Sequence, residues 1–140
     1  MTGNALPPFR ADHVGSLLRR EELKTARAAY EAEELDADGL RQVEDRLIRE
    51  VVAKQESLGL RAVTDGEFRR SWWHFDFLAG LEGVELVRGE KTIKFAGIET
   101  KSESIAINGR VAFGDHPMLD HFRYLDEVAS VTPKMTIPSP

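Results

Sequence analysis

The sequence predicts an α/β fold in which helices alternate with short buried strands. The clearest helix spans Asp36 to Leu58, where apolar residues recur every three or four positions and form one stripe. A short apolar run, Leu60 to Thr64, follows it and is typical of a buried strand. This strand ends in Asp65-Gly66-Glu67. A helix that leads to a strand ending in polar residues is the pattern of a (β/α) barrel, where chemistry lies on the loops after the strands.

The rest of the chain extends this pattern to about three barrel strands, so we expect an incomplete TIM-type (β/α) barrel. The bounds of the other predicted elements follow from good helix formers, short apolar runs and turn residues. The further predicted elements are a flexible arm over 1–8, a short strand running into a loop over 9–16 with Gly15-Ser16 as the break, a helix over 21–32, a short aromatic helix over 71–78, a helix beginning at Asp115 and Pro117, and a strand over 134–137.

Residues 84–113 differ in character and predict a β-hairpin inserted into the single domain 1–140. Two apolar runs, Ile105 to Ile107 and Val111 to Phe113, flank Asn108-Gly109. Asn-Gly supplies the positive φ angles of a type I′ turn, the usual connection of a tight hairpin. We therefore expect the hairpin to turn at Asn108-Gly109.

Composition excludes several classes of function. The net charge is −5 and acidic residues are interleaved with the basic ones. This argues against a nucleic acid or an anionic membrane as partner. The chain has no cysteine, so it can form neither a disulfide nor a thiolate metal site. It shows no secretory signal and no apolar run near the ~20 residues that span a bilayer, which predicts a cytoplasmic protein. Common nucleotide-binding and hydrolase motifs are also absent from the sequence.

The acidic turn Asp65-Gly66-Glu67, followed by Arg69 and Arg70, is the first candidate site. A carboxylate at a strand end could bind a substrate ammonium group, and an arginine could hold a carboxylate through two hydrogen bonds. Together these groups suit an amino acid. The alternative is a polar turn with surface ion pairs, and the local sequence alone favours that interpretation.

The second candidate site is His13-Val14-Gly15-Ser16. Small residues after a strand allow backbone N–H groups to approach a ligand carboxylate, and the Ser16 hydroxyl adds a donor. An ordinary strand-to-loop turn explains the same residues. His13 could bind a ligand or carry a proton, although a lone histidine is more often a hydrogen-bonded structural group.

Three segments, taken in order, resemble a known family. They are Phe9 to Arg19, Gln55 to Arg70 and Pro133 to Pro140. They are similar to bacterial proteins related to the C-terminal catalytic half of cobalamin-independent methionine synthase. The resemblance implies that residues 1–140 are the N-terminal portion of a TIM-type barrel. It also implies an activity, the transfer of a methyl group from a folate to the thiol of homocysteine, which gives methionine.

The resemblance also implies roles for particular residues. Val14-Gly15-Ser16 stands where the family has an Ile-Gly-Ser motif that contacts the amino-acid substrate. Glu67 stands where the family has the glutamate of a His-Gly-Glu turn, which binds the same substrate. His13, Asp65 and Arg69 complete the expected substrate-binding set. The methionine synthases themselves have threonine at the position of His13.

Zinc is the cofactor that the resemblance implies. The family holds the ion with His, Cys and Glu ligands from later barrel strands, and zinc keeps the substrate thiol as a reactive thiolate. We therefore expect this chain to supply no metal ligand, and residues 1–140 alone to be inactive.

Two other functions stay open. One is alkyl transfer to a different thiol on the same scaffold, because loop variation changes the substrates of barrels. The other is a non-catalytic oligomerising module, which the missing metal ligands suggest. An unfinished sheet exposes edges and apolar faces. We therefore expect self-association, or completion by a second chain.

Overall fold

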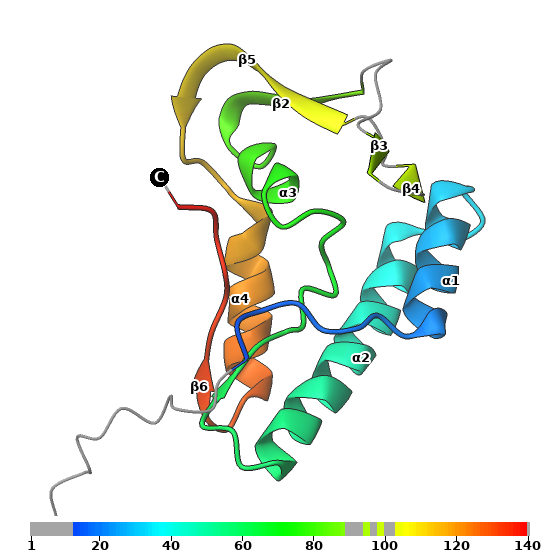
Figure 1. The fold of residues 1–140 in the computed structure, drawn as a ribbon, viewed down its shortest axis with the longest axis vertical. Helices are drawn as coiled ribbons and strands as arrows, with labels where there is room; N and C mark the ends of the chain where they lie inside the picture. The colour runs from blue at the N-terminus through cyan, green and yellow to red at the C-terminus, as the bar shows by residue number, and fades with distance from the viewer. Residues whose placement is uncertain (1–12, 89–93, 96–97, 100–102, 140) are drawn as a thin grey trace, which may run out of the picture. The chain divides into compact units, whose positions relative to one another are not determined.

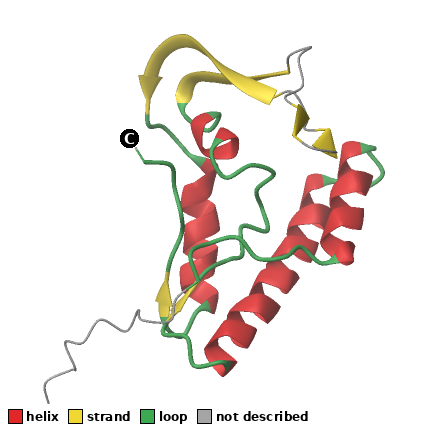
Figure 2. Cartoon of the chain, viewed as in Figure 1, coloured by secondary structure: helices red, strands yellow, loops and turns green. Residues whose placement is uncertain are grey.

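The structure is a computed structural model that describes residues 13–88, 94–95, 98–99 and 103–139. It is an α/β structure of four helices and six short strands over these residues (Figures 1 and 2). The chain divides into two compact units. The first runs up to Arg69 and includes His121–Thr136, and the second comprises Arg70–Asp120 and the residues from Ile137 onward.

Two helices, α1 (Glu21–Glu31) and α2 (Ala37–Ser57), lie side by side in the first unit, close to the predicted bounds (Figure 1). Asp36 caps α2, because its side chain accepts a hydrogen bond from the N–H of Gly39 at 2.8 Å. Gly59 ends α2 with φ +83°, the left-handed conformation that favours glycine.

The first unit contains one small parallel sheet. β1 (Ala62–Val63) pairs with β6 (Thr132–Pro133), with Ala62 opposite Thr132. The last strand was predicted over 134–137, so it lies earlier in the chain than expected. A short strand running into a loop was predicted over 9–16, and the described residues 13–16 form a loop. Residues 9–12 lie outside the described part of the chain, as does the arm over 1–8.

The core of the first unit lies between its helices and β1. It also receives the C-terminal part of α4 (Pro117–Val128), which begins where the sequence predicts. Packed apolar side chains of this kind provide most of the stability of a small domain. The core residues are Leu23, Leu47, Ile48, Val52, Val63, Phe68 and Leu125.

The second unit contains α3 (Phe75–Leu78), which is shorter than the predicted helix over 71–78. It also contains two antiparallel pairs, β2 with β5 and β3 with β4. β2 spans Glu82–Arg88 and β5 spans Glu103–Ala112, and between them in the chain lie the short strands β3 (Lys94–Phe95) and β4 (Ile98–Glu99).

The predicted turn at Asn108-Gly109 is wrong, because β5 continues through both residues. The partner of β5 is β2, with Val84 opposite Ile107 and Glu82 opposite Ala112. The irregularity between these two pairs lies at Gly83, which carries the positive φ (+74°) that was expected at Asn108-Gly109. A Cβ on Gly83 would lie 2.6 Å from the carbonyl oxygen of Arg110, so only glycine allows this close approach.

The three described sheets have two strands each and none closes on itself. The helices and strands together confirm the α/β class. The partial TIM-type barrel stays a prediction. Among the described residues, no helix combines the length and hydrophobicity needed to cross a bilayer.

Candidate functional site

Three segments that are distant in the sequence meet in the first unit. They are the loop that begins at His13, the acidic turn after β1, and the residues after β6. The N–H of Leu17 donates to the carbonyl oxygen of Gly66 at 3.0 Å, which joins the first two segments. The ammonium group of Lys134 donates to the carbonyl oxygen of His13, which joins the first and third. The two predicted candidate sites are therefore neighbours.

Glu67 is at the centre of this arrangement and is only 8% exposed. Its φ is +57°, a left-handed conformation that costs a non-glycine residue about 1–2 kcal/mol. Its N–H donates to Oδ1 of Asp65 at 2.9 Å, and its carbonyl oxygen accepts from Nη2 of Arg19 at 3.1 Å. Its carboxylate Oε1 accepts from the hydroxyl of Thr136 at 2.7 Å. Surrounding residues thus fix both the backbone and the charged group.

Gly15 allows the Glu67 carboxylate to lie directly against the loop. A Cβ on Gly15 would lie 2.6 Å from Oε1 of Glu67 and 2.8 Å from Oγ1 of Thr136. Real Cβ atoms do not approach neighbours so closely, because the electron shells repel. The absence of a side chain at Gly15 therefore brings backbone and carboxylate together.

Thr64 and Gln55 hold the base of the site. The Thr64 hydroxyl donates to the carbonyl oxygen of Gly15 at 2.9 Å and accepts from the N–H of Gly66 at 3.1 Å. The Gln55 side chain, from α2, pairs with both backbone groups of Thr64, at 3.0 Å to the N–H and 2.8 Å to the carbonyl oxygen. These roles could not be predicted, because Gln55 lies within the predicted helix and Thr64 within the predicted strand, and the sequence does not show that they meet.

The other predicted residues of the His13 loop and the acidic turn differ in burial and in hydrogen bonding. Asp65 is buried and accepts the N–H of Glu67. Ser16 is exposed, and its carbonyl oxygen accepts from Nε2 of His13 at 2.6 Å. Val14 is 77% exposed, so it provides backbone and not a core side chain.

Arg69 is not brought to this site, contrary to the sequence-based expectation. Its guanidinium group forms ion pairs with Glu44 at 3.4 Å and with Asp45, both on α2. The same group lies 5.0 Å from the ring centroid of Tyr124. Because the side chain is 4% exposed, these contacts fix it within the first unit as a structural group.

Glu44 is the buried partner of Arg69 and of Arg27, which lies 3.0 Å away. Burial raises the pKa of Glu44 above its ordinary value of 4.5, and the charges of Arg27 and Arg69 lower it in part. Desolvation of the carboxylate therefore outweighs the two ion pairs. Arg27 also donates to the carbonyl oxygen of Phe68, so this cluster connects the turn after β1 to α1 and α2.

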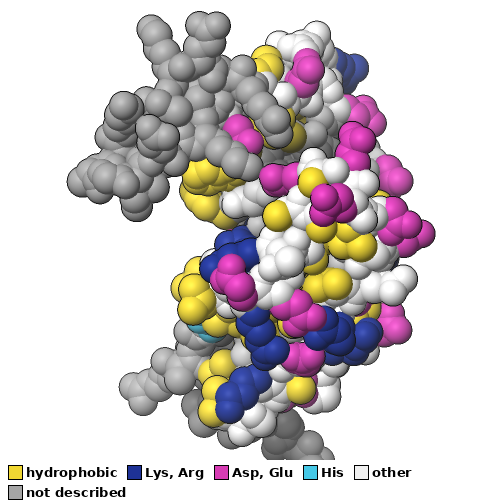
Figure 3. Space-filling view, turned by 90° about the vertical axis from the view of Figure 1, so that its right-hand side faces the viewer, with side chains coloured by type: hydrophobic (Ala, Val, Ile, Leu, Met, Phe, Trp, Pro, Cys, Tyr) yellow, Lys and Arg dark blue, Asp and Glu magenta, His cyan; other side chains and the backbone are white. Residues whose placement is uncertain are grey.

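The outer face of α1 and α2 carries mixed charge. Arg20 pairs with Glu50, and Arg46 pairs with Glu22 and Glu50. Figure 3 shows basic and acidic side chains interleaved over this face. Exposed ion pairs of this kind contribute little to stability.

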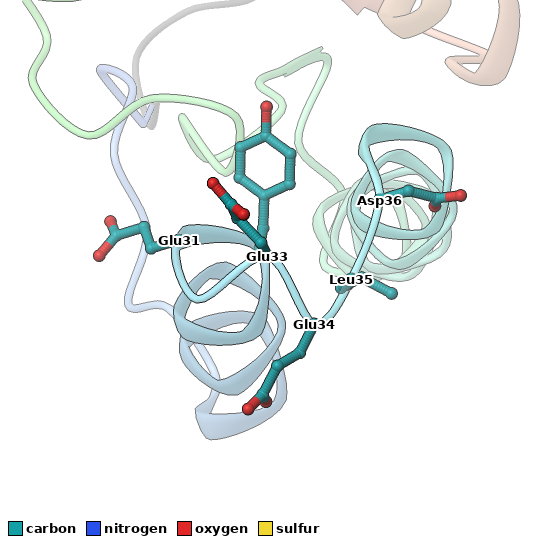
Figure 4. A pocket seen from close by; sticks show the side chains of 6 residues that line it. Glu31, Glu33, Glu34, Leu35 and Asp36 are labelled. Atoms are coloured by element: carbon teal, nitrogen blue, oxygen red, sulfur yellow. The ribbon is translucent and has the colours of Figure 1, made fainter.

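An open hollow lies at the turn between α1 and α2, lined by Tyr30, Glu31, Glu33, Glu34, Leu35 and Asp36. Its carboxylates point in separate directions, as the close view shows (Figure 4). A cation needs several oxygen ligands directed at one point. Within the described ranges, no three His, Asp or Glu side chains are grouped to hold a metal ion.

Two curated relatives match almost the whole chain. The uncharacterized protein YxjG of Bacillus subtilis is 53% identical over 135 residues, covering 96% of this chain and 36% of the relative. The uncharacterized protein YxjH of the same organism is 52% identical over 134 residues, with 95% and 36% covered. The chain thus spans about a third of the length of these relatives. No protein-family model matches it.

A solved structure has a fold similar to that of this chain. It is a crystal structure from Listeria monocytogenes, reported as a candidate vitamin-B12 independent methionine synthase. Its TM-score is 0.78 and its sequence identity is 41%, over 97% of this chain and 38% of the solved one. The chain is similar to part of a candidate methionine synthase. The likeness supports the α/β class and the resemblance found from the sequence motifs.

Proposed function

We propose that this chain forms the amino-acid-binding part of a methyltransferase that transfers a methyl group from a folate to the thiol of homocysteine, giving methionine. The observation that carries the proposal is the Glu67 carboxylate, held by Thr136 directly against Gly15. The similarity to a candidate methionine synthase supports the choice of reaction. A cytoplasmic location belongs to the same proposal.

In this proposal the two ends of the amino acid bind to different segments. The Glu67 carboxylate accepts hydrogen bonds from the ammonium group, and the charge makes these bonds strong. The backbone N–H groups of Val14 to Ser16 and the exposed Ser16 hydroxyl donate to the carboxylate of the ligand. His13 holds this loop through Ser16, and Asp65 holds the backbone of Glu67.

The described residues do not fit a zinc site. The chain has no cysteine, and its described His, Asp and Glu side chains form no group of three. The contribution that we propose for residues 1–140 is therefore to bind and orient the amino-acid end of the substrate.

Binding of homocysteine to the 140-residue chain tests this proposal, measured by titration calorimetry. We expect Glu67→Gln to lower the affinity at least about tenfold, because hydrogen bonds to a charged group contribute about 1.5–3 kcal/mol. Glu33→Gln is the matched control, since Glu33 has nearly the same φ (+59°) but is exposed at another turn. The proposal fails if the unmodified chain does not bind homocysteine or if Glu67→Gln binds it equally well.

A panel of thiols separates this proposal from transfer to another acceptor. Homocysteine is compared with 2-mercaptoethanol, which has a thiol but neither an ammonium group nor a carboxylate. We expect only homocysteine to show an affinity that depends on Glu67. If both thiols bind equally, a different thiol substrate is favoured.

A further inference from the structure

We propose that Thr136 is the positioning residue for the Glu67 carboxylate and thereby makes the site select thiols that carry an α-amino acid end. This inference rests on the proposed function. Thr136 belongs to no motif that the sequence analysis assigned to substrate binding. Its contacts within the first unit carry the inference.

The sheet brings Thr136 to Glu67. β1 and β6 are parallel neighbours, and the N–H of Lys134 donates to the carbonyl oxygen of Val63 at 2.8 Å, which extends their pairing. The residues that follow two parallel neighbouring strands leave the sheet at the same end. Thr136 and Glu67 therefore meet, although they are 69 positions apart in the chain.

The Thr136 side chain restricts the carboxylate in two ways. Its hydroxyl donates to Oε1 of Glu67 at 2.7 Å, within the usual range for a bond to a charged oxygen. Its methyl group lies 3.1 Å from where a Cβ of Gly15 would be, so it closes the space beside the loop. A charged group that is 8% exposed requires such partners, because burial removes its water.

This placement sets the distance between the two charges that a ligand must match. The carboxylate lies against Gly15, so the ammonium group must bind close to the loop that binds the ligand carboxylate. In an α-amino acid both groups are attached to one carbon atom, which meets this condition. A preorganised group of this kind gains affinity, because it does not have to be ordered on binding.

Two variants of Thr136 in the 140-residue chain test the inference. Thr136→Val keeps the shape but removes the hydroxyl, and Thr136→Ser keeps the hydroxyl. In the ligand-free chain, NMR follows the side-chain carboxyl carbon of Glu67, assigned with Glu67→Gln. We expect Thr136→Val to move this signal and Thr136→Ser to leave it near its original position.

Calorimetry then compares homocysteine with 4-mercaptobutanoic acid, which lacks the ammonium group. We expect Thr136→Val to lower the affinity for homocysteine about ten- to a hundredfold, and Thr136→Ser to restore it to within about threefold. The affinity for 4-mercaptobutanoic acid should not change, so the selectivity falls. A merely structural role would weaken both ligands alike, and that result would overturn the inference.

A third variant changes the same contact without altering Thr136. Gly15→Ala places a Cβ only 2.6 Å from Oε1 of Glu67, so the carboxylate must move. The variant should therefore move the carboxyl signal and lower the homocysteine affinity as Thr136→Val does. An unchanged carboxyl signal in both Thr136→Val and Gly15→Ala overturns the positioning role. If the unmodified chain binds no homocysteine, the proposed function fails, whereas the ligand-free signal still decides the role of Thr136.

Discussion

Glu33 and Glu67 have nearly the same backbone conformation in two different regions of the first unit. Their φ angles are +59° and +57°, values that L-residues rarely adopt. Glu33 follows α1 and is exposed, whereas Glu67 follows β1 and is 8% exposed. The difference in their surroundings explains why each conformation persists.

The conformation of Glu33 is supported by local backbone bonds. The N–H of Glu34 donates to the carbonyl oxygen of Ala29 at 2.8 Å, and the N–H of Glu33 donates to the carbonyl oxygen of Tyr30 at 3.1 Å. This is the Schellman pattern of a helix end, which usually has glycine at the left-handed position. α2 ends in the same pattern with Gly59. Glu33 therefore serves a turn that glycine could form.

The conformation of Glu67 depends on bonds to side chains, two of which, Arg19 and Thr136, come from distant parts of the chain. Arg19, Asp65 and Thr136 each hold a different group of this residue. Strain that the surrounding structure fixes in this way is typical of functional positions. A positive φ angle alone therefore does not mark a candidate site, because Glu33 has one as well. Glu67 differs in the bonds that it receives from Arg19 and Thr136, which are distant in the chain.

The largest effect is expected from a variant that removes the hydrogen bonds supporting the turn at Glu67. Gln55→Leu deletes both partners of the buried backbone of Thr64, and each unsatisfied group costs about 1–3 kcal/mol. We expect the free energy of unfolding to fall by about 2–4 kcal/mol in urea titrations. Glu34→Gln, at the exposed turn, should change it by less than about 0.5 kcal/mol. Equal losses in the two variants would contradict the comparison.

A smaller effect tests the strain at Glu33. Glu33→Gly relieves the left-handed conformation and should raise the free energy of unfolding by about 0.5–1 kcal/mol, since the greater freedom of unfolded glycine offsets part of the gain. Glu67→Gly relieves the same angle but deletes the carboxylate that Thr136 binds, so we expect no net gain. Differential scanning calorimetry measures both. Stabilisation of similar size in both variants would show that the long-range contacts of Glu67 contribute nothing.

The smallest effect concerns the buried ion pairs beyond the Glu67 turn. Because burial raises the pKa of Glu44 in the folded state, its contribution to stability is complete below pH 4.5 and is lost as the pH rises through the raised pKa. The difference in unfolding free energy between the unmodified chain and Glu44→Gln should therefore decrease as the pH rises from 4.5. Urea titrations over this range measure it. A difference that grows with pH would mean that Arg27 and Arg69 outweigh burial.

Local patterns predicted the helices well, and long-range pairing limited the rest. The apolar stripe of α2 depends on residues that are close in the chain, so the helix and its approximate bounds are visible in the sequence. Asn108-Gly109 was misread because the choice of β2 as the partner of β5 overrides local turn preference. The sequence shows both segments but not their register.

The candidate site follows the same rule. Gly15 and Glu67 belong to the two candidate sites chosen from the sequence, and in the structure they lie close to each other. Arg69 was assigned to the site from its position in the chain, but its ion pairs with α2 could not be seen there. Thr136 was missed because its role requires the pairing of β6 with β1 to be known.

The amide of Gln55 has one more consequence. It satisfies the N–H and the carbonyl oxygen of Thr64 together, as a neighbouring strand would. Strand edges with free backbone groups recruit further strands and promote aggregation. The Gln55 side chain occupies both backbone groups of Thr64. A foreign peptide therefore cannot pair with the backbone of Thr64 by β-augmentation.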